Sequence, residues 1–150
     1  MRRLLPAAGL LVAAFLARSV QATPSDALWH ATVTVESRGN PRARNRREGA
    51  AGVVQIRRAC LQDVNRIARD EGLGERFTAA DRLDPAKSRR MWELYLRHYG
   101  RQYREASGFA PTDEVYARIW NGGPVGHLKA STLAYWQRII SAMQGLEGRG

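Results

Sequence analysis

The sequence predicts a mainly α-helical domain with about five helices and at most a small β-hairpin near residues 42–51. Apolar residues recur at helical spacing through most of the chain, which is typical of helices with one buried face. Glycine, proline or a capping side chain stands where these stretches begin or end. Residues 42–51, by contrast, lack an apolar period and hold four arginines, so any β-structure is expected there.

The first helix is indicated by an apolar face that begins near Leu28. Ser25 is a suitable N-cap for it, and Pro41 ends it because proline lacks a backbone N–H and disfavours helix at the preceding residue. Residues 32–35 are β-branched and alternate as in a strand. From the residues alone, both a helix ending near Glu36 and a strand remain open.

A second helix is expected to begin between Val53 and Gln55. Apolar positions recur from Val53 to Ile67 at helical spacing, and Cys60 falls on this inward stripe. Gly72 and the glycine two residues later supply the stop.

The third helix has the clearest boundaries. Asp84 is an N-cap with Pro85 at the first helical position, and Gly108 is the stop. One stripe of this helix is expected to be buried core and not a sugar-stacking platform: Ser88, Trp92, Tyr95, Leu96, Tyr99 and Tyr103.

Two further helices follow. Thr112 caps the fourth, which breaks at Asn121–Pro124, and the fifth begins near Thr132. The residues of the fifth helix expected to face inward are Leu133, Trp136, Ile139, Ile140 and Met143.

Residues 1–22 have the features of a signal peptide. Two arginines precede the apolar run 4–16, and residues 20–22 form a small-x-small cleavage site. We expect cleavage after Ala22 and export, either to the periplasm or out of the cell. An uncleaved anchor is the alternative, although the run is short for a membrane span.

Residues 23–144 are expected to form one domain and residues 145–150 a flexible tail. Removing residues 1–22 deletes three arginines and no acid, so the formal charge falls from +10 to +7. A basic exported protein favours an anionic polymer such as a cell-wall layer. Nucleic acid is the rival partner, and the export signal argues against it. The basic cluster that would serve either partner is Arg38, Arg42, Arg44, Arg46 and Arg47.

Cysteine and histidine usage limits the other classes of site. Cys60 is the only cysteine, so no intramolecular disulfide can form. We interpret it as a small buried hydrophobe and not as a reactive thiol. The three histidines are widely separated and do not form a ligand pattern. No metal and no cofactor are therefore expected, and a monomer is the expected state.

Four motifs carry a family resemblance. Glu36–Pro41 reads ESRGNP, Gly49–Ile56 reads GAAGVVQI, Ala117–Pro124 reads ARIWNGGP and Thr132–Ile139 reads TLAYWQRI. Together they resemble the lysozyme and lytic transglycosylase superfamily, in particular the bacterial lytic transglycosylase (SLT) domain and the invertebrate-type lysozymes. The resemblance covers about residues 27 to 140, and it favours the helical alternative for the segment before Glu36.

The resemblance implies an α+β lysozyme-like fold around a substrate cleft and a peptidoglycan-cleaving activity. The bond would be the β-1,4 linkage between N-acetylmuramic acid and N-acetylglucosamine, with Glu36 as general acid and base. The family's substrate-contacting positions correspond to Ser37, Gln55, Asn121, Gly122, Gly123 and Tyr135, the last as the tyrosine that hydrogen-bonds the acid. The implied partner is the glycan strand, with a secretion or conjugation apparatus as a further candidate.

Hydrolysis needs a second carboxylate besides a protonated acid, either as nucleophile or as base for a water. Invertebrate-type lysozymes carry an Asp in this loop, whereas this chain has Asn45 and Arg46 there. The nearest acid is Glu48, which is either the second carboxylate or a solvated surface residue. If Glu48 is idle, the reaction left is that of a lytic transglycosylase, in which Glu36 acts alone. A catalytically inactive cell-wall binding module is the remaining alternative.

Overall fold

The computed structural model describes residues 23–148. The expected signal peptide and its cleavage site after Ala22 lie outside the described residues. Within the described part, no helix is long and apolar enough to cross a membrane. The elements are α1 (Asp26–Ser37), β1 (Arg44–Asn45), β2 (Ala50–Ala51), α2 (Arg58–Asp70), η1 (Ala80–Leu83), α3 (Pro85–Ser107), α4 (Asp113–Gly122), η2 (Gly126–Leu128), η3 (Ala130–Thr132) and α5 (Leu133–Glu147).

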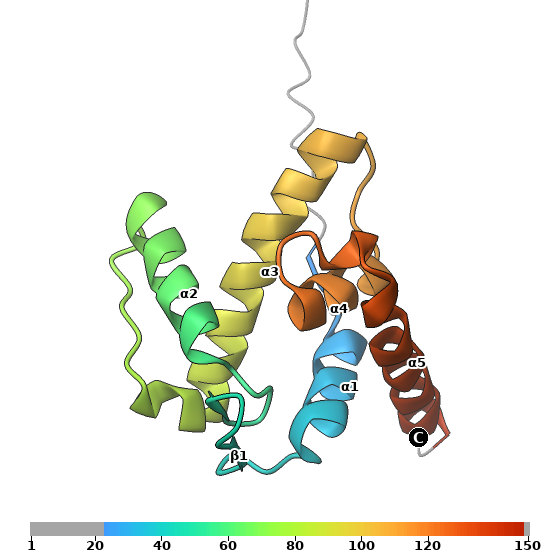
Figure 1. Cartoon of the computed structure of the whole chain (residues 1–150), viewed down its shortest axis with the longest axis horizontal. Helices are drawn as coiled ribbons and strands as arrows, with labels where there is room; N and C mark the ends of the chain where they lie inside the picture. The colour runs from blue at the N-terminus through green and yellow to red at the C-terminus, as the bar shows by residue number, and fades with distance from the viewer. Residues whose placement is uncertain (1–22, 149–150) are drawn as a thin grey trace, which may run out of the picture.

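The long helix α3 runs through the middle of the molecule (Figure 1). On one side of it lies α2, and on the other side lie α1, α4 and α5, with α1 packed on α5 and α4 packed on both α3 and α5. The two strands pair antiparallel in the segment between α1 and α2, with Arg44 opposite Ala51. The mainly helical fold with one small hairpin is therefore confirmed.

Helix α1 resolves the ambiguity at residues 32–35, which are helical. The Ser25 side chain caps the helix by accepting from the Leu28 N–H at 3.0 Å. The Thr32 hydroxyl donates to the Leu28 carbonyl at 2.7 Å, a bond that lets a buried threonine sit within a helix. The helix therefore continues long enough to place Glu36 on its last turn.

The expected start of the second helix is wrong. Residues 53–56 form a compact turn in which Gln55 has a left-handed φ of 52°, and α2 begins only at Arg58. Ile56 instead pairs with Ala51, with backbone bonds of 2.9 and 3.2 Å in the two directions. Val53, Val54 and Ile56 are buried, so the apolar run reflects a buried loop and not the first turn of a helix.

Helices α3 and α4 follow the sequence closely. The Asp84 side chain caps α3 with Pro85 at its start, and Gly108 ends it with a φ of 78°. The Thr112 side chain caps α4. Most of the predicted stripe of α3 is core, because Ser88, Trp92, Tyr95, Leu96 and Tyr99 are buried. Its last member, Tyr103, is only half-buried and lies outside the core.

Helix α5 corrects one expected contact. Leu133 is 45% exposed, whereas Tyr135 and Ile139 are buried, because α5 turns these two residues toward the core. Trp136 and Met143 are partly buried against that core. The helix continues to Glu147 and thus includes part of the segment expected to be a loose tail.

Candidate active site

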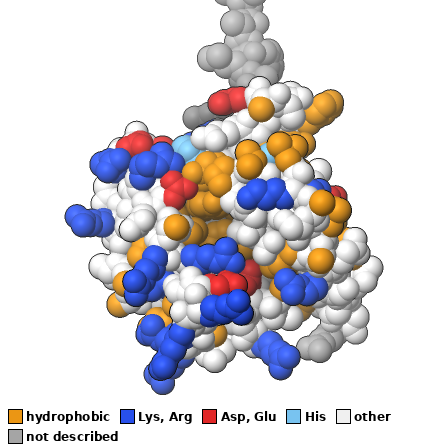
Figure 2. Space-filling view, viewed as in Figure 1, with side chains coloured by type: hydrophobic (Ala, Val, Ile, Leu, Met, Phe, Trp, Pro, Cys, Tyr) orange, Lys and Arg blue, Asp and Glu red, His pale blue; other side chains and the backbone are white. Residues whose placement is uncertain are grey.

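A cavity of about 800 Å³ opens between the two sides of the molecule. In the space-filling view the middle of this face is hollowed, with hydrophobic side chains inside and Lys and Arg side chains around the rim (Figure 2). Its lining residues come from α1, the hairpin segment, α2, α3, α4 and α5. Those that bear on the chemistry are Glu36, Asn45, Glu48, Gln55, Arg57, Cys60, Tyr95, Asn121, Gly122, Gly123, Tyr135 and Arg138.

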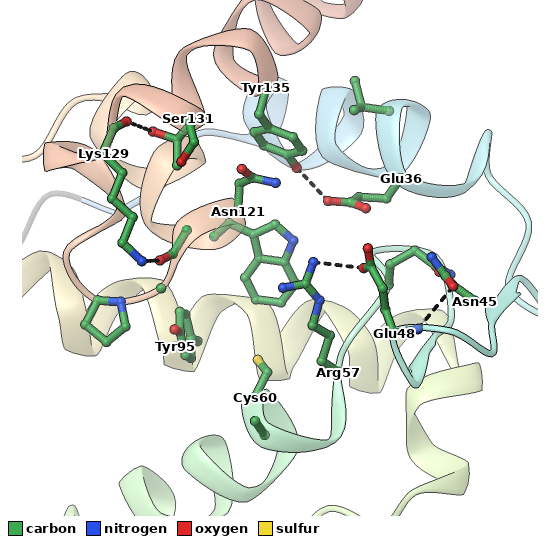
Figure 3. Close-up of a pocket in the computed structure, with 18 of the residues that line it drawn as sticks. Glu36, Asn45, Glu48, Arg57, Cys60, Tyr95, Asn121, Lys129, Ser131 and Tyr135 are labelled. Atoms are coloured by element: carbon green, nitrogen blue, oxygen red, sulfur yellow. Dashed lines mark hydrogen bonds and ion pairs between the residues drawn. The ribbon is translucent and has the colours of Figure 1, made fainter.

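Glu36 lies on the last turn of α1 and faces this cavity. The Tyr135 hydroxyl donates to Glu36 Oε1 at 2.8 Å (Figure 3). Burial raises the pKa of the Glu36 carboxyl, because a desolvated anion is disfavoured. The Tyr135 bond, Arg138 and Arg57 lower it, and Glu48 raises it further; the net pKa is above the ordinary value. The group is thus suited to hold a proton inside a cleft.

Tyr135 is positioned by the packing of α5 on α1. Its ring is 3% exposed, and the guanidinium of Arg138 lies 5.5 Å from the ring centroid. Arg138 follows Tyr135 by three positions and so projects from the same face of α5. Sequence reasoning missed both Arg138 and Arg57 at this site, although the helical spacing from Tyr135 was a signal for Arg138.

Glu48 lines the same cavity from the opposite wall. Its carboxylate accepts from Arg57 Nη2 at 2.8 Å, and its side chain is 48% exposed. Its backbone N–H donates to Asn45 Oδ1 at 3.2 Å, which fixes the turn between the strands (Figure 3). Glu48 is therefore a solvated, ion-paired carboxylate that nevertheless faces the cleft.

Ser37 and Gln55 make backbone contacts that hold the walls together. Ser37 Oγ donates to the Val53 carbonyl at 2.8 Å, linking α1 to the turn before α2. Gln55 Nε2 donates to the Gly52 carbonyl at 2.9 Å and to the Ala43 carbonyl at 3.3 Å. The Gln55 amide nitrogen thus stabilises the hairpin, while the residue also lines the cavity.

Asn121, Gly122 and Gly123 form the edge of the cleft at the end of α4. A Cβ on Gly122 would lie 2.5 Å from Thr132 Cγ2, so only glycine permits this approach. The Lys129 ammonium donates to the Gly122 carbonyl at 2.6 Å. These contacts close the turn after α4 against the start of α5 and hold the Asn121 side chain over the cavity (Figure 3).

Two further lining residues are structural in character. Burial raises the pKa of the Cys60 thiol to about 12, so the group is an unreactive thiol at neutral pH. Trp120 packs edge-on against Tyr95, with ring centroids 5.7 Å apart. Within residues 23–148, no group of three or more His, Cys, Asp and Glu side chains is arranged to hold a metal ion.

Comparison with known proteins places this architecture in a family. Residues 15–140 match the family described as Transglycosylase SLT domain. The chain belongs to this family.

Among curated proteins it is 30% identical over 91 residues to a lysozyme of Ostrea edulis, covering 60% of this chain and 58% of that protein. It is 34% identical over 90 residues to Lysozyme 1 of Crassostrea virginica, covering 60% and 43%. A lysozyme of Magallana gigas is 46% identical over 44 residues, covering 29% and 32%. The chain thus spans about a third to three-fifths of the length of these relatives.

Solved structures share the fold of this SLT domain. A chain in the crystal structure of Aeromonas hydrophila PliI in complex with Meretrix lusoria lysozyme has a TM-score of 0.62 and 23% identity, covering 77% of this chain and 88% of that one. The crystal structure of Tapes japonica lysozyme has a TM-score of 0.58 and 24% identity, with coverages of 77% and 87%. The lysozyme-like fold expected from the motifs is confirmed.

Proposed function

We propose that this SLT domain is an exported muramidase that cleaves the β-1,4 bond between N-acetylmuramic acid and N-acetylglucosamine in peptidoglycan, with Glu36 as general acid and base. One observation carries the proposal: a carboxyl with raised pKa, bonded to Tyr135, lies in a cavity of about 800 Å³. A positioned acid of this kind is the minimum equipment for breaking a glycosidic bond. The names of the curated relatives and the signal-like sequence of residues 1–22 support it.

In the first step, Glu36 donates its proton to the glycosidic oxygen as the bond to the anomeric carbon breaks. The departing sugar leaves as an alcohol, and positive charge develops on the ring that remains. Glu36 is then a carboxylate that accepts a bond from the Tyr135 hydroxyl. In the second half-reaction Glu36 can act as the base, since a group that has donated its proton can accept one from the attacking hydroxyl or water.

For hydrolysis, we assign Glu48 as the second carboxylate that the reaction needs. Its carboxylate is exposed and accepts from Arg57, whereas the Glu36 carboxyl lies in the cleft with its pKa raised by burial. A pair of carboxyls flanking the scissile bond, one as acid and one as nucleophile or base, is the usual arrangement in a glycosidase. In this route, water adds to the anomeric carbon and the product has a reducing end.

A lytic transglycosylase is the second candidate, and the pairing of Glu48 with Arg57 favours it, because an occupied carboxylate is less available to the sugar. In this route, Glu36 removes the proton of the muramyl C6 hydroxyl, and that oxygen closes on its own anomeric carbon. No water enters, and the product is an anhydro sugar. Mass spectrometry of digested cell walls distinguishes the two products.

The test of enzymatic function is a peptidoglycan zymogram of the purified protein beside Glu36→Gln. We expect clearing by the wild type and a loss of about 100-fold or more in the variant, since general acid catalysis contributes on the order of 10²–10⁴-fold. The exposed Glu105 on α3, outside the cavity, supplies the matched control Glu105→Gln. A wild type that binds peptidoglycan without clearing it would establish the inactive binding module instead.

A further inference from the structure

A second groove continues from the cleft along the hairpin. It has a volume of about 720 Å³ and shares Val35, Glu36, Asn45 and Gln55 with the main cavity. Its remaining lining residues are Ser37, Arg38, Ala43, Arg44 and Arg46. A ligand bound in this groove therefore lies directly beside Glu36.

The charge along this groove is positive and not neutralised by the protein. The exposed arginines of the segment are Arg38, Arg42, Arg44, Arg46 and Arg47. Within the part of the chain that the structure describes, none of their side chains takes part in an ion pair or hydrogen bond. Glu48 is the only acid between positions 38 and 57, and it is bound to Arg57. The free guanidinium groups are thus available to an external anion.

The backbone beneath these arginines is fixed by contacts from outside the hairpin. Arg82, which is buried, donates to the Gly49 and Ile56 carbonyls at 2.9 and 2.8 Å. The Gly52 N–H donates to the Ala43 carbonyl at 2.9 Å, next to Arg44. Anchoring of this kind reduces the conformational entropy lost when a ligand binds.

We propose that this arginine groove binds the free carboxylates of the peptide stem on the muramyl residue, so that the enzyme favours strands that carry their stems. The inference rests on the proposed muramidase function. The stem is attached to the sugar at the cleaved bond, so its carboxylates are the anionic groups of the substrate nearest to Glu36. A guanidinium pairs with a carboxylate through two parallel hydrogen bonds. Arg44 in β1 and Arg46, two positions further along the chain, both line the groove.

The experiment compares two forms of one substrate: glycan strands with tetrapeptide stems, and the same strands stripped of peptide by an amidase. The lactyl carboxylate that the amidase leaves on each muramyl residue is then converted to its neutral amide. The variant is Arg44→Gln with Arg46→Gln. The matched control is Arg76→Gln with Arg104→Gln, two exposed arginines outside both grooves. We expect the first variant to raise KM on stem-bearing strands roughly 10-fold or more, with kcat unchanged. Neither variant should change KM on stripped strands.

An equal change in KM on both substrates, or no change on either, overturns the proposal. Calorimetric titration with a disaccharide tetrapeptide and with the peptide-free disaccharide, its lactyl carboxyl likewise converted to the amide, gives the same comparison without turnover. A wild type that cleaves neither substrate refutes the muramidase function, and the titration still decides the groove. Purified teichoic acid is the third titrant: arginine-dependent binding of this phosphate polymer, without discrimination between the two disaccharides, also overturns the assignment to the stem.

Discussion

The two walls of the cleft carry the same functional group in opposite environments. On the helical wall, Glu36 is shielded by the packing of α1 on α5 and accepts from the buried Tyr135 hydroxyl. On the hairpin wall, Glu48 is exposed and accepts from a guanidinium. Burial favours the neutral form of a carboxyl, and it raises the pKa of Glu36. The difference teaches that the fold around each carboxyl, and not the carboxyl itself, sets the environment on which the proposed roles of Glu36 and Glu48 depend.

The largest expected effect tests the role of the hairpin wall. Replacing Glu48 with Gln removes the proposed second carboxylate, so hydrolysis should fall by about 100-fold or more, while formation of anhydro ends continues. Mass spectrometry of digested cell walls measures both products, with Glu105→Gln as the control. If the Glu48→Gln enzyme still releases reducing ends at the wild-type rate, Glu48 has no role in hydrolysis. Only the helical wall would then carry a catalytic carboxyl.

The second prediction concerns how the hairpin wall is held in place. A Cβ on Gly52 would lie 1.7 Å from the Arg82 carbonyl oxygen, and its φ is 85°. Gly52→Ala should therefore lower the free energy of unfolding by about 2–4 kcal/mol, as measured by urea denaturation. Gly74→Ala is the matched control, because Gly74 has a φ of 66° and open space around it; it should cost about 1 kcal/mol. Equal costs would show that backbone strain alone, and not the contact with Arg82, makes Gly52 necessary.

The third prediction addresses the helical wall. Tyr135→Phe removes the hydroxyl that bonds Glu36, so kcat should fall about 10-fold, the usual size of one hydrogen bond to a charged group. That bond lowers the pKa of Glu36, so its loss raises the pKa. Activity that requires protonated Glu36 should then persist to higher pH. The pH profile of kcat shows the direction of this shift, with Tyr103→Phe as the control. A fall in activity that begins at lower pH in Tyr135→Phe than in the wild type would contradict the role assigned to the Tyr135 hydroxyl.

The smallest effects are changes in the pKa of Glu36 itself. Arg138 lowers this pKa and Glu48 raises it, so Arg138→Gln should move it up and Glu48→Gln should move it down. Titration of the ¹³C-labelled carboxyl by NMR measures both shifts directly. Shifts of the same sign in the two variants would mean that neither side chain acts on Glu36 through its charge.

Some of the fold could be predicted from the sequence because its signals are local. Asp84 with Pro85, Thr112 and Gly108 define helix ends by bonds within a few residues, and these boundaries are correct. The start of α2 could not be predicted, because Val53, Val54 and Ile56 are as apolar as a helical stripe. Their burial in a turn depends on Ala51 and on Arg82, which lies 26 positions after Ile56.

The sequence by itself determined the helical order, the motifs and Glu36 as the candidate acid, since these depend on near neighbours and on residue type. Only the tertiary structure decided the state of that acid. Tyr135 reaches Glu36 across 99 positions, and Arg57 and Arg138 approach it from two different walls. Desolvation and charge act through space, so the raised pKa of Glu36 exists only once the chain has folded. The same holds for the hairpin arginines, whose side chains find no partner within residues 23–148.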